Sequence, residues 1–95
     1  MAMYQRGESV VCSLKTRNTS GDLVNPDTSI RITVTDGSGI NLVTSADMTN
    51  DGTGLYHFDF NSTTAHRVGR YRVRYVTVDA GRTTVVDEYF ELEIP

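Results

Sequence analysis

The residues with the greatest potential for binding chemistry are arginines gathered in one short stretch. The 95-residue sequence holds nine basic residues, and five of them fall within positions 67–82, namely Arg67, Arg70, Arg72, Arg74 and Arg82. Guanidinium groups bind carboxylates and phosphates through paired hydrogen bonds. One interpretation is a stripe that meets an acidic protein partner or a phosphate backbone. The simpler one is an exposed strand face whose arginines pair with Asp87, Glu91 and Glu93.

The sequence contains no evident catalytic or metal-binding grouping. His57 and Asp59 share one side of a predicted strand and could supply two metal ligands, whereas a zinc site needs at least three. His66 lies in a predicted loop. Cys12 has apolar residues two positions away on either side, which predicts a buried apolar residue rather than a nucleophile. We therefore expect no catalytic residue, no metal, no cofactor and no enzymatic activity.

Two segments rich in Asp, Asn and Gly, at 36–39 and 50–54, raise the question of calcium. Neither has the alternating oxygen ligands and distal bidentate Glu of an EF-hand loop. Hydrogen bonds from Asx side chains and the conformational freedom of glycine account for both segments as turns without an ion.

Composition limits the classes of partner. The formal net charge is −3, whereas nucleic-acid-binding domains usually present a net basic surface, so no nucleic acid is expected. No run approaches 18 apolar residues, so no membrane-spanning helix is expected. Cys12 is the single cysteine, which excludes an intramolecular disulfide. The length corresponds to one domain over residues 1–95.

The arginine stretch lies in the clearest strand of the sequence. Over 69–78, apolar residues alternate with basic or polar ones, which is the period of a half-buried strand. A two-residue turn at Ala80-Gly81 would pair this strand with 82–93, so that the numbers of facing residues sum to 161.

This register predicts a hairpin with opposite charges paired on one face and apolar residues paired on the other. The favourable pairs are Arg74 with Asp87, Arg70 with Glu91, Tyr71 with Phe90, and Tyr75 with Val86. Arg72 faces Tyr89 and has no acidic partner, so it is the arginine most expected to meet another molecule. Glu88 falls opposite Val73 on the apolar face, and this misfit predicts a bulge near Asp87-Glu88 or a strand end that reaches solvent.

The remaining segments add short strands at spacings near ten residues. Alternation predicts strands near 8–17, 30–35, 40–44 and 55–60, with turns at 18–22, 36–39 and 50–54 and a short extended piece at Leu23-Val24. About seven strands with turns between them predict a two-layer sandwich rather than a barrel.

The aromatic residues fall mostly on predicted core faces, which bears on a carbohydrate partner. Carbohydrate-binding sandwiches present exposed planar aromatics, and here only Tyr4 and Tyr89 are left for that purpose. A carbohydrate partner therefore ranks below a protein partner.

With the strands placed, the sequence resembles immunoglobulin-like β-sandwich modules of the macroglobulin or bacterial surface-repeat type. The likeness rests on segments 4–10, 21–24, 32–39, 54–56 and 69–73, in that order. It implies an all-β fold, a single immunoglobulin-like antiparallel sandwich of about seven strands. Tyr71 resembles the tyrosine that anchors a corner at the start of a late strand in such sandwiches. The chain lacks a Trp and a Cys pair, so antibody-type recognition is not implied.

Free-standing, disulfide-free sandwiches of this size look similar to accessory structural proteins of tailed-phage virions. The resemblance implies a non-catalytic capsid decoration, head–tail or tail protein that acts through protein–protein contacts. Its partners would be capsid or tail subunits or further copies of itself, and its location the virion, after synthesis in the host cytoplasm. The alternative is a module of a larger bacterial or archaeal surface or adhesin protein, located at the cell surface.

Overall fold

The structure, a computed structural model, describes residues 2–18, 20–25, 29–79 and 81–94. Its regular elements in this part of the chain are β1 (Ala2–Gln5), β2 (Ser9–Lys15), β3 (Ser29–Thr35), β4 (Asn41–Asp47), β5 (Thr49–Gly52), β6 (Leu55–Asn61), β7 (Gly69–Asp79) and β8 (Arg82–Glu93). The described residues contain no helix. The prediction of an all-β chain is therefore confirmed, with eight strands rather than seven.

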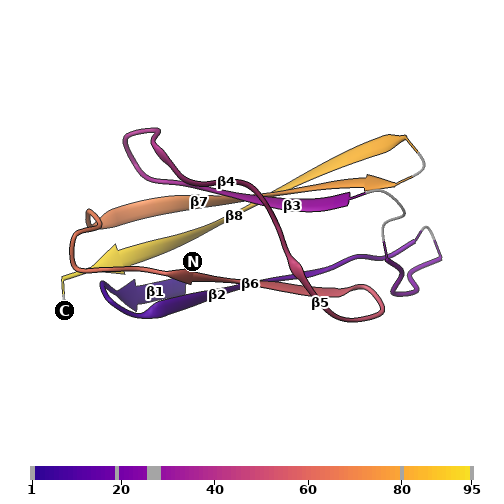
Figure 1. The fold of residues 1–95 in the computed structure, drawn as a ribbon, viewed down its shortest axis with the longest axis horizontal. Coiled ribbons are helices and arrows are strands. Elements are labelled where there is room, and N and C mark those ends of the chain that lie inside the picture. Colours follow the sequence, from indigo (N-terminus) through magenta and orange to yellow (C-terminus); the bar gives the residue numbers. More distant parts are fainter. Residues whose placement is uncertain (1, 19, 26–28, 80, 95) are drawn as a thin grey trace.

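The strands form two sheets that face each other as the layers of a sandwich (Figure 1). The larger sheet has the order β1-β8-β7-β3-β4, and the smaller sheet has the order β2-β6-β5. Neighbouring strands run antiparallel except β1 and β8, which are parallel. The molecule is elongated, at 42 × 23 × 19 Å, and the long hairpin of β7 and β8 extends along it (Figure 1).

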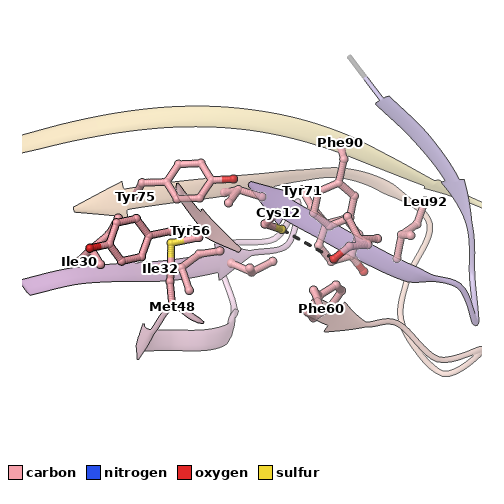
Figure 2. Close-up of a cluster of buried hydrophobic side chains, with 13 residues drawn as sticks. Cys12, Ile30, Ile32, Met48, Tyr56, Phe60, Tyr71, Tyr75, Phe90 and Leu92 are labelled. Carbon is pink, nitrogen blue, oxygen red and sulfur yellow. Dashed lines mark hydrogen bonds between the residues drawn. The ribbon is translucent and has the colours of Figure 1, made fainter. Parts of the chain in front are cut away.

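The core lies between the sheets and is built from alternate residues of β2, β3, β6, β7 and β8, together with Met48 between β4 and β5. Its buried side chains are Val10, Cys12, Ile30, Ile32, Val34, Met48, Tyr56, Phe60, Tyr71, Val73, Tyr75, Phe90 and Leu92. Tyr71 and Phe90 stack at 5.1 Å between ring centroids, and Phe60 reaches them from the opposite sheet (Figure 2). Aromatic rings bury large apolar areas, so this cluster joins the two layers at one end of the sandwich.

A tyrosine corner leads the chain into β7. The hydroxyl of Tyr71 donates a hydrogen bond to the backbone carbonyl of Arg67 at 2.7 Å, which confirms the role expected from the resemblance. In antibody domains the second cysteine of the inter-sheet disulfide lies two residues after this tyrosine. That position holds Val73 here, so Cys12 on β2 is a free, buried thiol.

The predicted register of the β7–β8 hairpin is confirmed along its whole length. Residue numbers of facing partners sum to 161 from Gly69 and Leu92 to Asp79 and Arg82. The turn residue Ala80 lies outside the described part of the chain. The predicted bulge near Asp87-Glu88 is wrong, because the pairing is continuous there.

Glu88 is accommodated opposite Val73 because the inner side of β8 is open at this point. Its side chain is exposed, and the Tyr75 hydroxyl donates a hydrogen bond to its carboxylate at 3.2 Å. The misfit that the sequence indicated is therefore resolved by solvent and one hydrogen bond.

Two strands were not predicted. β1 has no clear alternation and exists through its parallel pairing with β8, and β5 lies inside a segment expected to be a turn. The turn proper is Thr53-Gly54, and Leu23 forms only an isolated bridge with Arg17. The partner of β1 is distant in sequence, which local alternation does not reveal. β5 pairs with the neighbouring strand β6, but its Thr-Asn-Asp-Gly sequence has no apolar alternation and is typical of a turn.

Candidate protein-binding surface

The outer face of the larger sheet, turned away from β2, β5 and β6, carries three of the five predicted arginines. Arg70, Arg72 and Arg74 alternate along β7 with core residues, so their side chains all lie on this face. Their surroundings differ, and the differences decide which of them is available to another molecule.

Arg74 is already paired within the chain. Its Nε and one terminal nitrogen donate to the two carboxylate oxygens of Asp87 at 2.8 and 2.9 Å. These hydrogen bonds from Arg74 lower the pKa of Asp87 and raise that of Arg74. The predicted Arg74–Asp87 ion pair is confirmed. Because Asp87 already accepts two hydrogen bonds from Arg74 and neutralises its charge, Arg74 is less available to a partner than Arg70 or Arg72.

Arg70 does not form an ion pair with Glu91, although the two residues face each other as the register predicts. The guanidinium carbon of Arg70 lies instead 5.4 Å from the ring centroid of Tyr89. The prediction of an Arg70–Glu91 pair is therefore wrong. A guanidinium over an aromatic face retains its outward hydrogen-bond donors, because the contact uses the flat side of the group.

Arg72 lies between Thr35 of β3 and Tyr89 of β8. Its Nε is buried and makes no hydrogen bond with any described residue. A buried donor without an acceptor is unfavourable, since the group has lost water and gained nothing in exchange. Arg72 is thus the least satisfied cation on this face, which agrees with its lack of an acidic partner in the sequence register.

An open groove brings Arg70 and Arg72 together. We call it the arginine groove; it has a volume of about 440 Å³ and is lined by Thr35, Asp36, Gly37, Gly39, Asn41, Arg70, Arg72 and Tyr89. One wall is the β3–β4 turn, and the other is the strand pair β7–β8. The groove therefore combines residues from four strands and one turn, which no single stretch of sequence contains.

The acidic residue in this groove is occupied by its own turn. The Asp36 carboxylate accepts hydrogen bonds from the Ile40 backbone N–H at 3.0 Å, and from the Ser38 backbone N–H and hydroxyl at 2.9 Å. These bonds, that from Ile40 foremost, lower the pKa of Asp36. The turn is thus stabilised by Asx-type hydrogen bonds to one oxygen of the carboxylate, Oδ1.

Comparison with known proteins confirms the class of fold. No protein-family model and no curated protein sequence matches the chain. Among solved structures, the M1 domain from titin superposes with a TM-score of 0.51 at 24% identity, covering 98% of this chain and 84% of that one. The fold is immunoglobulin-like. The fold alone does not specify a function or a partner.

The other two predicted arginines do not line the groove, although Arg67 is close enough to Asp36 to act on its charge. Arg67 precedes β7, where its carbonyl accepts the Tyr71 hydrogen bond and its side chain lines a separate hollow with His66. Arg82 begins β8 opposite Asp79, at the far end of the hairpin. The five arginines of the sequence therefore do not form one cluster.

The polar residues considered for metal chemistry do not form a metal site. His57 Nδ1 lies 2.6 Å from the Asp51 carboxylate, and its Nε2 lies 4.0 Å from that of Asp59. The hydrogen bond to Asp51 raises the pKa of His57. No group of three or more His, Cys, Asp or Glu side chains suited to a metal ion occurs among the described residues.

Cys12 and Tyr4 belong to the core or pack against it, whereas Tyr89 lines the arginine groove. Cys12 is 4% exposed, and burial raises the pKa of its thiol to about 11, so it is protonated at neutral pH. Tyr4 packs edge-on against Phe90 at 6.0 Å, and only Tyr89 of the two predicted free tyrosines is largely exposed.

None of the described segments is a helix that could cross a membrane.

Proposed function

We propose that this domain is a non-catalytic assembly module that binds an acidic segment of a partner protein in the arginine groove. The observation that carries the proposal is the pair Arg70 and Arg72, two guanidiniums that line one open groove and form no ion pair within 4.0 Å among the described residues, although the charge of Arg72 also acts on nearby Asp87. A carboxylate in the groove would accept charge-assisted hydrogen bonds from these guanidiniums. Arginine and tyrosine are also the residues that contribute most to protein interfaces.

Titration with N-acetylated hexaglutamate, followed by NMR at low ionic strength, tests the groove. The Nε–H resonances of Arg70 and Arg72 should shift, and R72A should weaken binding by about fivefold or more. R31A is the matched control, because Arg31 lies on the same sheet but pairs with Asp47 at 3.1 Å. Equal loss of binding in R31A and R72A, or equal binding of hexaglutamine, would show that the groove does not recognise carboxylates.

We further propose that the assembly is a tailed-phage virion, in which the domain serves as a decoration, head–tail or tail protein and is located in the virion. The sequence resemblance and the absence of an intramolecular disulfide support this proposal. The genes that flank the coding sequence test it directly. Portal, capsid or tail genes on either side are the expected result, and genes for cell-wall attachment or secretion would contradict it.

A second candidate is a module of a longer surface or adhesin protein. It is supported by the solved neighbour, which is itself one domain of titin. An open reading frame that continues through further β-sandwich repeats on either side would favour this candidate over the virion protein.

A further inference from the structure

The larger sheet has a long free edge along β8. β1 pairs with β8 only from Phe90 to Glu93. From Arg82 to Tyr89, no described strand pairs with β8 on the side away from β7. Every residue in this stretch is exposed. The backbone N–H and C=O groups directed to that side are thus available to another strand.

The side chains of this edge do not prevent strand pairing. Its centre is the run Thr83, Thr84, Val85 and Val86, all β-branched residues of high strand propensity. Val85 is 51% exposed and Val86 is 41% exposed. Natural edges are usually protected by a proline, a bulge or charged side chains, lysine especially. Between Arg82 and Tyr89 this edge has no proline, lysine or bulge, and its charged residues, Arg82, Asp87 and Glu88, stand at the two ends of the stretch.

The charges on this edge are complementary to those of a second copy placed antiparallel to it. A two-fold axis at Val85 sets Val85 opposite its own counterpart and Arg82 opposite Glu88, twice. It also sets Thr83 opposite Asp87. Arg82 and Glu88 lie on the same face of β8, because they are six residues apart. Such a pair places opposite charges directly across the new ladder at both ends.

We propose that two copies of this chain associate through their β8 edges to form one continuous sheet across the dimer. The paired segment runs from Arg82 to Glu88 and therefore ends before Phe90, where β1 begins to occupy the edge. It also leaves the arginine groove open on the outer face, since Arg70 and Arg72 lie on β7. The inference is thus independent of the acidic partner proposed above.

The open side of the sandwich supplies further contact area. Two hollows, of about 220 and 160 Å³, lie between β8 and the edge strand β2. Glu88 lines the first, and Thr84 and Val86 line the second. A second copy at the β8 edge would cover these partly apolar hollows, which adds apolar burial to the backbone hydrogen bonds.

Sedimentation velocity of the full chain, from micromolar to about 1 mM, tests the dimer. We expect a reversible monomer–dimer equilibrium that V85K weakens by about tenfold or more, because two lysines would then face each other at the two-fold axis. I40K is the matched control, since Ile40 is 59% exposed and lies at the β3–β4 turn. A chain that is monomeric throughout, or a V85K variant that dimerises like I40K, would overturn the proposal.

Complementary charge variants test the register and do not depend on the fold of V85K. R82E and E88R should each be monomeric alone, because each places like charges opposite one another. Mixed in equal amounts, they should form a heterodimer in which both pairs are again of opposite charge. A mixture that remains monomeric while the unmodified chain dimerises would exclude pairing centred on Val85.

Discussion

Tyr71 connects the core to the backbone that leads into β7. Its ring is buried against Phe90, and its hydroxyl satisfies the Arg67 carbonyl. Y71F should lower the free energy of unfolding by about 1 kcal/mol, because a neutral hydrogen bond contributes that much and the carbonyl loses its partner. Urea denaturation measures the difference.

Y56F is the matched control for the corner tyrosine. Tyr56 is also buried, but its hydroxyl makes no hydrogen bond with a described residue. A loss of stability in Y71F no greater than that in Y56F would show that the hydroxyl of the corner does not stabilise the fold.

His57 makes the stability of the β5–β6 hairpin depend on pH. Its hydrogen bond to Asp51 raises its pKa above the ordinary 6.5, so the folded state binds the proton more tightly than the unfolded state. The resulting stabilisation is complete below about pH 6.5 and is lost as the pH rises through the folded-state pKa. An NMR titration of the imidazole should give a pKa above 6.5, and D51N should lower it. An unchanged value in D51N would mean that Asp51 is not the cause.

At the scale of elements, Gly54 fixes the β5–β6 turn against the segment after β2. Its φ is +72°, and an added Cβ would lie 2.7 Å from the Thr16 carbonyl oxygen and 2.9 Å from the Val24 nitrogen. The backbone of this turn is also bonded to Thr16, whose N–H donates to the Gly54 carbonyl at 2.9 Å. Close approach and a left-handed conformation therefore coincide at this residue.

G54A should destabilise the domain by more than the roughly 1–3 kcal/mol that a left-handed conformation alone costs. G7A separates the two effects, because Gly7 has a φ of +96° and nothing lies within 4 Å of its added Cβ. Thermal unfolding compares the two variants. Equal losses in both would mean that the turn moves aside and that the contact with Thr16 is unimportant.

At the scale of the whole molecule, the burial of the long hairpin is uneven. Near Tyr71 and Phe90 both strands cover the core, whereas all of β8 from Arg82 to Tyr89 is exposed. In dilute solution, amides of residues 83–86 should exchange with solvent at least about tenfold faster than those of Tyr71 and Val73. Hydrogen-exchange NMR measures these rates. Uniform protection along the hairpin in the monomer would contradict this gradient.

The sequence by itself determined the features that depend on near neighbours. Alternation over 69–78 and the turn before Arg82 were sufficient for the complete β7–β8 register, including the Arg74–Asp87 pair, because hairpin pairing follows from local spacing. The burial of Cys12 followed in the same way from its period, whereas the corner role of Tyr71 followed from the resemblance to immunoglobulin-like sandwiches.

Only the tertiary structure decided which groups remain free. The placement of Arg70 over Tyr89, the unsatisfied Nε of Arg72 and the unpaired edge of β8 all depend on segments distant in the chain. The parallel pairing of β1 likewise requires a partner distant in the chain. Local periodicity tells which side of a strand is apolar, whereas the contacts of its polar side and its edge are set by how the two sheets and their neighbours pack.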